Sequence, residues 1–515
     1  MAKRRAASAP VAAAPIGTTN TDSTNCAPNA DANNANRRIY SPVDIPELME
    51  LLQRQDNDSC LEAVRGFRRM LSIEKNPPVE AVLSSGVMPI LVQILSNGAN
   101  ETLQFEACWA LTNIASTDYT KCVVDSGAVP HLVHLLSSPH ADCREQSAWC
   151  LGNISGDCAE LRDVVLGCDA LQPMLNNITH PANDSLLSNV VWSLSNMCRG
   201  KPQPQLDIIR PCLPVLAALL QTSKNNEILV DVCWSLSYLS DGNEQRIQAV
   251  MENNVASLLV NRLDVSVPSL INPIIRCLGN FVSGSDAQTQ AVVDCGVIEK
   301  TPVLLSTAGQ RKVVKKETCW LLSNIAAGTH QQINAIFKER SVMSTVVNLV
   351  QRGEWEVRKE ATWVLSNIAT GGSDAHVMGI VEYGAIKALC SILEVADSKI
   401  VLVALDALSA IMKVGTKHGS NYAVLVDEAG GVEMIENLQE HENEKVYLKA
   451  VDILEEFFHG EEQEDENLAP AADGNAFSFG VSKNVNMFGE QQPQQYHQQG
   501  QAPLQFNFAN ANTYA

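Results

Sequence analysis

The sequence predicts an all-α solenoid built from stacked helical repeats. A pattern of Trp, three residues and Asn returns every 40 to 44 residues, which is the period of repeats made from two or three helices. Apolar residues also recur with helical spacing from about residue 45 to residue 460. We therefore expect about ten repeats of the armadillo or HEAT kind in one elongated body.

The repeated pattern defines one face of a helix in each repeat. Its complete copies are Trp109/Asn113, Trp149/Asn153, Trp192/Asn196, Trp320/Asn324 and Trp363/Asn367, and the two copies between them read Trp234/Tyr238 and Arg276/Asn280. Because residues i and i+4 share a helix face, each Trp should lie beside its Asn. The leucines between them, such as Leu111 and Leu151, should turn toward the core.

The two ends of the chain differ from the repeats in composition. Residues 1–44 are rich in Ala, Asn, Thr and Pro, hold basic clusters only at 3–5 and 37–38, and are predicted to be disordered. Within 45–460, Gly closes one helix and Pro or an apolar residue starts the next, as in 126–132. Residues 461–515 begin with an acidic run and continue as a Gln/Asn-rich tail, also predicted to be disordered.

Composition excludes several functions. A formal net charge of −21 argues against nucleic-acid binding and favours cationic partners. The 15 cysteines form no Cys-x-x-Cys pair and are expected to be reduced core thiols of a cytosolic or nuclear protein. The chain shows no apolar span for membrane insertion, no metal-ligand spacing and no phosphate loop. We therefore expect no enzyme activity, no cofactor and no metal site.

The residues around each Trp point to a peptide ligand. The position three before each Trp is polar and mostly acidic: Glu106, Gln146, Asn189, Asp231, Glu317 and Glu360. The Asn row could hold the backbone of an extended peptide, the indoles could hold cations, and the acids would select Lys or Arg. The alternative for any one copy is a core Trp with Asn in a helix-end bond, but a stacked series favours a binding surface.

The array is interrupted at Arg276. Trp109, Trp149, Trp192 and Trp234 precede it, and Trp320 and Trp363 follow it. We infer two sites for basic clusters in one groove, suited to two clusters joined by a spacer, because linkage raises affinity without new contacts.

These residues resemble the importin-α (karyopherin α) family. The ladder, the stretch 104–115 and the stretch 441–447 carry the resemblance, which spans roughly residues 45–465. It implies ten armadillo repeats in a right-handed superhelix, a nuclear import adaptor for mono- and bipartite nuclear localisation signals, and shuttling between cytoplasm and nucleus. The alternative is an armadillo scaffold that binds extended peptides without a transport role; the acids of the groove favour cationic cargo over the acidic ligands of such scaffolds.

The resemblance also implies residue roles. The major site would comprise Trp109, Asn113, Trp149, Asn153, Asp157, Trp192, Asn196, Glu227, Asp231 and Trp234, and the minor site would comprise Arg276, Asn280, Glu317, Trp320, Asn324, Glu360, Trp363 and Asn367. The family begins with a long basic helix for importin-β and autoinhibition, which is missing here or reduced to the clusters at 3–5 and 37–38. The run 461–466 resembles the recycling exportin's binding region, and Phe477 to Gly480 resembles nucleoporin repeats.

Overall fold

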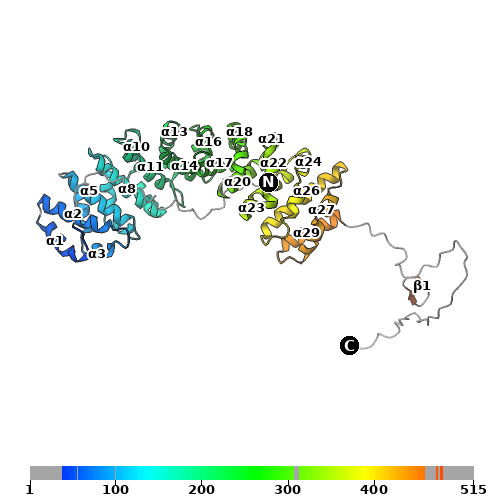
Figure 1. Cartoon of the computed structure of the whole chain (residues 1–515), viewed down its shortest axis with the longest axis horizontal. Coiled ribbons are helices and arrows are strands. Elements are labelled where there is room, and N and C mark those ends of the chain that lie inside the picture. The colour runs from blue at the N-terminus through cyan, green and yellow to red at the C-terminus, as the bar shows by residue number, and fades with distance from the viewer. Residues whose placement is uncertain are drawn as a thin grey trace, which may run out of the picture.

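The computed structural model describes residues 38–458, apart from 55, 99 and 307–311, together with residues 471–473 and 476–478. Within these ranges the body is a curved stack of helices that runs from α1 to α29 (Figure 1). The basic residues 3–5 and the acidic run 461–466 lie outside the described residues. The prediction of an all-α repeat body is confirmed.

One long helix from each repeat lies on the inner side of the curve. These inner helices are α2 (Asn57–Leu71), α5 (Glu101–Ala115), α8 (Ala141–Asp157), α11 (Asp184–Cys198), α14 (Asn226–Ser240), α17 (Pro268–Val282), α20 (Lys312–Ala326), α23 (Trp355–Gly371), α26 (Ser398–His418) and α29 (Glu444–Phe457). Each packs against the inner helix before and after it in sequence, so together they form one continuous layer.

Two shorter helices per repeat form the rest of the body. The first of each pair are α3 (Val79–Ser84), α6 (Thr120–Asp125), α9 (Ala159–Gly167), α12 (Leu206–Ile209), α15 (Glu244–Met251), α18 (Asp286–Asp294), α21 (His330–Lys338), α24 (Asp374–Glu382) and α27 (Tyr422–Glu428). The second are α4 (Met88–Ser96), α7 (Ala128–Leu135), α10 (Leu171–Thr179), α13 (Cys212–Thr222), α16 (Val255–Arg262), α19 (Thr301–Leu305), α22 (Arg340–Arg352), α25 (Ala385–Cys390) and α28 (Gly431–Asn437). Figure 1 places α10, α13 and α16 on the outer rim, across from the inner layer.

Local sequence fixes where the inner helices begin. The side chains of Asn100 and Asn183 accept hydrogen bonds from the backbone N–H of Leu103 and Leu186, and Asp56 caps α2 in the same way through Ser59. Such caps satisfy an N–H group that has no partner within the helix.

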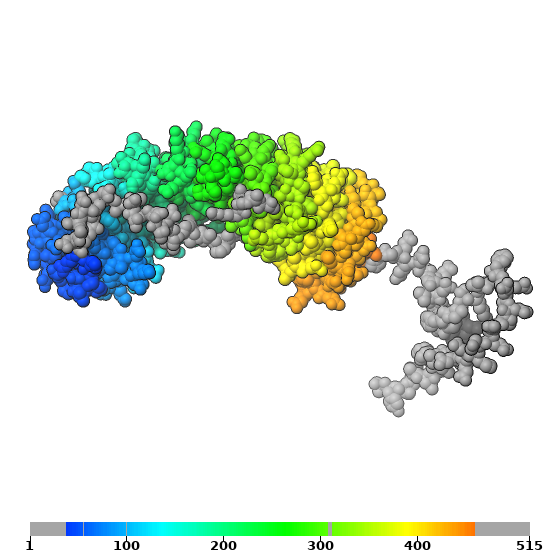
Figure 2. All heavy atoms as spheres, in the orientation of Figure 1, coloured from blue at the N-terminus to red at the C-terminus, as the bar shows by residue number. Residues whose placement is uncertain are grey.

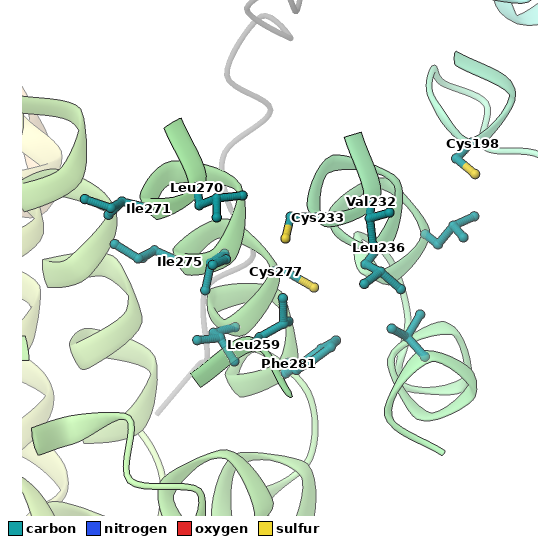
Figure 3. Close-up of a cluster of buried hydrophobic side chains, with 14 of the residues drawn as sticks. Cys198, Val232, Cys233, Leu236, Leu259, Leu270, Ile271, Ile275, Cys277 and Phe281 are labelled. Carbon is teal, nitrogen blue, oxygen red and sulfur yellow. The ribbon is translucent and has the colours of Figure 1, made fainter. Parts of the chain in front are cut away.

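The core runs along the stack between the inner and outer helices. Leu111 and Leu151 are fully buried, as predicted for the residues between Trp and Asn. Figure 3 shows Cys198, Cys233 and Cys277 among the apolar side chains of one buried cluster. Burial raises the pKa of the Cys277 thiol to about 12, which keeps it a neutral, unreactive core residue.

The ordered body begins earlier than the sequence predicts. Tyr40 is buried, and a short 3₁₀ helix, η2 (Pro42–Asp44), precedes α1 (Ile45–Gln53). The guanidinium of Arg38 donates to Asp44 at 2.8 Å and to Glu47. Residues 38–44 therefore belong to the body rather than to the predicted disordered segment, because Arg38 pairs locally and is not a free basic residue.

The tail contains a short structured element. Strand β1 (Ala471–Asp473) pairs antiparallel with β2 (Ala476–Ser478), with Ala472 opposite Phe477. The prediction of disorder therefore does not hold for these two strands. Two further 3₁₀ turns, η3 (Ile298–Lys300) and η4 (Leu438–Glu440), complete the described secondary structure. No helix within the described ranges is both long and apolar enough to cross a bilayer.

Candidate functional site

The indoles of the repeated pattern lie on the inner helices. Figure 2 shows how the described body curves, which gives these helices a concave side. Trp109, Trp149, Trp192, Trp234 and Trp363 are half-buried, so each keeps part of its ring open. Five of the six pattern tryptophans are thus only partly buried, and one of these, Trp363, packs against the core. Only Trp320 is 4% exposed and fits the core alternative.

Two glycines make room for neighbouring indoles. A Cβ added to Gly279 would lie 2.0 Å from Cζ3 of Trp320, and one added to Gly152 would lie 2.6 Å from Cζ3 of Trp192. Each glycine precedes the pattern Asn of the preceding repeat. A glycine in that place is therefore the sequence signal for an indole that packs closely on the helix before it, and sequence reasoning missed it.

The pattern asparagines tie successive inner helices together. The Nδ2 groups of Asn153, Asn196 and Asn280 donate to the carbonyls of Thr112, Gly152 and Ser237, at 3.2, 3.1 and 2.9 Å. Asn113 donates to the Arg68 carbonyl at 3.3 Å, and Asn367 donates to the Ser323 carbonyl at 2.7 Å. Asn113 and Asn280 also donate to Ser72 Oγ and Ser240 Oγ, at 2.9 and 3.2 Å. These amides were expected to bind peptide backbone, but their N–H groups are used in part or in full within the chain.

The carboxamides still have capacity for a ligand. A carboxamide carries two N–H donors and an oxygen with two lone pairs. A bond to one carbonyl uses a single donor, as in Asn153, whereas Asn113 uses both donors and can offer only its oxygen to a ligand. Asn113 and Asn153 are half-buried, whereas Asn196, Asn280, Asn324 and Asn367 are buried. The amides nearest the start of the array are therefore the most accessible to a peptide.

Arg276 forms an internal ion pair with Glu317, an acid predicted for the minor site. Its Nη2 donates to Oε1 of Glu317 at 2.6 Å, and its Cζ lies 5.6 Å from the Trp320 ring centroid. Lys316 Nζ lies 3.2 Å from the same Glu317 oxygen. Glu317 is buried, because its charge is neutralised by these two cations. The role predicted for Glu317, a free acid that selects cargo, is therefore taken by an internal ion pair.

The same arrangement recurs at the first indole. Arg65 and Arg68 on α2 each donate through Nε to Glu106, at 2.7 and 2.9 Å, and Arg68 Cζ lies 4.1 Å from the Trp109 ring centroid. Arg65 and Arg276 occupy the Trp position of their repeats. In both places the arginine at the Trp position of one repeat forms an ion pair with the acid three residues before the Trp of the next repeat. A guanidinium from the same helix also stacks on that Trp: Arg68 on Trp109, and Arg276 on Trp320. The chain itself thus places guanidinium groups on two of its indoles.

Other members of the row before each Trp also bind inside the chain. Gln146 Nε2 donates to Thr112 Oγ1 at 2.9 Å, and Asn189 Nδ2 donates to Glu145 Oε1 at 2.7 Å. These bonds join neighbouring inner helices. The polar row that the sequence assigned to cargo therefore also holds the stack together.

Asp231 is the exception in this row. Among the described residues its carboxylate has no hydrogen-bond or ion-pair partner, although the residue is half-buried. Burial raises the pKa of Asp231 to about 7, and the nearby Glu227 carboxylate adds to the increase. A carboxylate held this way gains most from an incoming cation.

The remaining predicted acids lie at the helix ends. Asp157 is exposed at the carboxyl end of α8, and Glu227 is exposed in the first turn of α14. Glu360 is half-buried on α23. The Trp234 ring stacks on Tyr238 with centroids 5.7 Å apart, so the tyrosine extends the aromatic surface where the pattern lacks its Asn.

Two basic residues near the second site, Lys359 and Arg358, form bonds within the chain. Lys359 Nζ lies 3.1 Å from Glu356 and 5.5 Å from the Trp355 ring centroid. Arg358 donates to the carbonyls of Val350 and Ser391. No grouping of His, Cys, Asp and Glu that could hold a metal occurs within the described part of the chain.

Comparisons with known proteins agree with this geometry. A sequence model described as "Armadillo/beta-catenin-like repeat" matches residues 75–116, 116–156, 201–241 and 285–327, and one described as "Atypical Arm repeat" matches 420–471. The chain is 43% identical to "Importin subunit alpha-1b" of Oryza sativa subsp. japonica, covering 85% of this chain and 83% of that protein. It is 44% identical to "Importin subunit alpha-2" of Arabidopsis thaliana, with the same coverage of each chain.

A solved structure supports the fold. An engineered protein superposes with a TM-score of 0.73 at 28% identity, covering 80% of this chain and 98% of that one. Together with the inner ladder of indoles and carboxamides, the relatives at more than 40% identity over most of both lengths establish the relationship. The chain belongs to the importin-α family of armadillo-repeat proteins.

Proposed function

We propose that this chain is a nuclear import adaptor that binds Lys/Arg-rich nuclear localisation signals along its inner helices. Membership of the importin-α family supports the proposal. The observation that carries it is the pair of internal guanidinium groups on Trp109 and Trp320, at 4.1 and 5.6 Å from the ring centroids. They show that the indoles of this fold accept cations beside an acid.

The open slots lie between these two filled positions. Within the described ranges no Lys or Arg side chain lies over the rings of Trp149, Trp192 or Trp234. Asp157, Glu227 and Asp231 accompany these rings and supply negative charge. We assign this stretch to the main cluster of a localisation signal, with Asn113 and Asn153 contacting the peptide backbone.

A second cluster would bind near Trp320 and Trp363. Arg276 and Glu317 separate this region from the first, and their ion pair leaves no free acid at that position. A bipartite signal would therefore place its second cluster beyond Arg276, near Trp363 and Glu360. Two such clusters on one peptide gain affinity through effective concentration.

The proposal includes transport partners. We expect the chain to link cargo to importin-β and to shuttle between cytoplasm and nucleus. We also expect the recycling exportin to return it. The nucleoporin-like Phe motif would add a contact with the nuclear pore. Binding of importin-β to the full chain and to a chain lacking residues 1–40 tests the first link. Equal binding by both would place the importin-β contact outside the short basic clusters.

A direct titration tests cargo binding. A fluorescently labelled extended peptide with one Lys/Arg cluster should bind the full chain, and added salt should weaken binding, since screening reduces exposed charge interactions. A peptide of the same length with Asp and Glu in place of the basic residues serves as the control. Preference for the acidic peptide would instead support the scaffold alternative.

A further inference from the structure

One step of the inner layer lacks the ties found at its neighbours. At the α8–α11 and α14–α17 steps, Asn196 and Asn280 donate to the carbonyls of Gly152 and Ser237. At the α11–α14 step the pattern Asn is replaced by Tyr238, and Asp231 makes no bond to α11 among the described residues. Trp192 and Trp234 therefore lie on the two helices of a step that lacks both ties.

The connection after α11 is longer than those after α14 and α17. Residues 199–205 separate α11 from α12, whereas residues 241–243 and 283–285 suffice after α14 and α17. Residues 199–204, called here the 199–204 loop, cross toward the carboxyl end of α14. Gln203 Nε2 donates to the carbonyl of Tyr238 at 2.9 Å and to that of Asp241. Lys201 Nζ also lies 3.0 Å from Asp241 Oδ2.

Arg162 holds the other end of this loop. Its side chain is fully buried on α9, with Nη1 donating to the Arg199 carbonyl at 2.7 Å and Nη2 donating to the Pro202 carbonyl at 2.8 Å. Asp163 accepts from Nε and Nη2 at 2.9 and 2.8 Å and balances the charge. Every contact of this guanidinium is charge-assisted or made to a backbone carbonyl, which suits a rigid anchor.

The loop is shaped to admit that guanidinium. Gly200 has φ of +102°, and a Cβ added there would lie 3.1 Å from Arg162 Nη1. Arg246 on α15 donates to the Pro204 carbonyl at 2.6 Å, so a second arginine fixes the far side of the loop. The 199–204 loop is thus bonded to α9, which packs against the Trp192 helix, to the end of the Trp234 helix α14, and to α15, which packs against α14.

We infer that the 199–204 loop, anchored by Arg162 and Gln203, replaces the missing tie and sets the spacing of the cation slot between Trp192 and Trp234. Arg162 and Gln203 are positioning residues for that slot. This arrangement leaves the Asp231 carboxylate without a hydrogen-bond or ion-pair partner among the described residues, while Tyr238 stacks on Trp234. Asp231 is therefore available to a cationic ligand. The inference rests on the proposed binding of basic peptides.

The test is a double-mutant cycle on the full chain. Each Lys of a single-cluster peptide is replaced in turn by Ala, and its affinity is measured against wild type, Gln203→Ala, Trp234→Ala and Trp149→Ala. The peptide position most strongly coupled to Trp234→Ala marks the slot. Gln203→Ala should weaken binding about tenfold and couple to that same position, as residues sharing one network do. It should not couple to the position marked by Trp149→Ala.

A matched control separates positioning from stability. Arg262 Nη2 donates to the carbonyls of Gln221 and Ser223, so Arg262→Ala also removes two bonds to backbone carbonyls, here at the carboxyl end of α13. Arg262→Ala should lower the unfolding temperature without any position-specific loss of binding. Arg162→Lys, which keeps the charge but loses the planar fork, should repeat the Gln203 pattern; if it fails to fold, Gln203→Ala decides.

The outcomes are distinct. Equal losses at every peptide position in Gln203→Ala, or wild-type binding in that variant, would overturn the inference and leave the proposed function intact. A wild-type chain that binds no basic peptide would contradict the proposed function, and the inference with it.

Discussion

Arg276 Nη2 lies 2.6 Å from Oε1 of Glu317, and the same guanidinium lies 5.6 Å from the Trp320 ring. An arginine from one repeat thus occupies the cation position of the next. At two places in the array an arginine of the chain itself lies beside the indole and the acid. At the other positions we propose that a cation of the ligand binds there.

Replacing Trp149 with Ala should weaken binding of a single-cluster basic peptide by about 2–4 kcal/mol, because buried aromatic anchors carry most of the energy at such interfaces. Fluorescence anisotropy measures the loss. Trp355→Ala is the control, since Trp355 lies outside the repeated pattern. Equal affinities for the two variants would remove Trp149 from the site.

Peptide affinity should depend on pH through Asp231. Because the pKa of this carboxyl is raised to about 7, it is partly protonated in the free chain and must ionise to bind a cation. Affinity should therefore rise from pH 6 to pH 8, with proton uptake by buffer in calorimetry at pH 6.5. Asp231→Asn should bind more weakly at pH 8 and lose most of this dependence; an unchanged pH profile in that variant would assign the effect elsewhere.

The Asp231 carboxyl should lower the free energy of unfolding at high pH. A raised folded-state pKa means that the folded chain binds more protons than the unfolded chain between about pH 4 and pH 7, so stability falls as pH rises through that window. Asp231→Asn should therefore be more stable than wild type at pH 8 and similar at pH 4. Chemical denaturation at both pH values checks this. Greater stability of wild type at pH 8 would show that Asp231 has an internal partner.

Removing Arg276 should destabilise the body. Arg276→Met leaves the buried Glu317 with only Lys316, at an expected cost of roughly 1–3 kcal/mol in unfolding free energy. Arg276→Met combined with Glu317→Gln should recover much of the loss, since no unpaired charge then stays buried. Additive losses in the double variant would mean that the two residues do not act as a pair.

Gly279→Ala should displace the Trp320 indole. The added Cβ would overlap the ring, and overpacking of this kind costs about 1–3 kcal/mol. Gly167→Ala is the matched control, because a Cβ there meets nothing within 4 Å. Thermal unfolding and binding of a bipartite peptide measure both effects. A normal unfolding temperature for Gly279→Ala would indicate that the indole moves at little cost.

Much of the fold follows from periodicity. The spacing of Trp109, Trp149 and Trp192 gave the repeat length, and Leu111 and Leu151 are buried as the i, i+4 pattern requires. What the sequence could not reveal are partners between repeats. From the sequence alone, Glu317 is interpreted as a free acid, because only the stacking of the repeats brings Arg276 beside it. In the same way, a pattern Asn is interpreted as a ligand-binding group, because the sequence does not show the carbonyl of the preceding helix to which it donates.

The 199–204 loop illustrates the same limit. Arg162 and Gln203 lie far from each other and from Tyr238 in sequence, and neither Arg162 nor Gln203 belongs to the repeated pattern. Only the bonds of Gln203 to the end of α14 connect the loop with the replaced Asn. The substitution of Tyr for Asn at 238 was visible in the sequence, but its structural compensation was not.

The most direct test of the indole slots compares two peptides on the full chain. One carries a Lys cluster, and the other carries norleucine, which has a side chain of similar length without charge, at the cluster's central position. If the slots recognise a cation between indoles and acids, the norleucine peptide should bind at least a hundredfold more weakly, as expected for loss of a buried charge-assisted contact of about 3 kcal/mol. Equal affinity of the two peptides would contradict the assignment of these indoles to cation recognition.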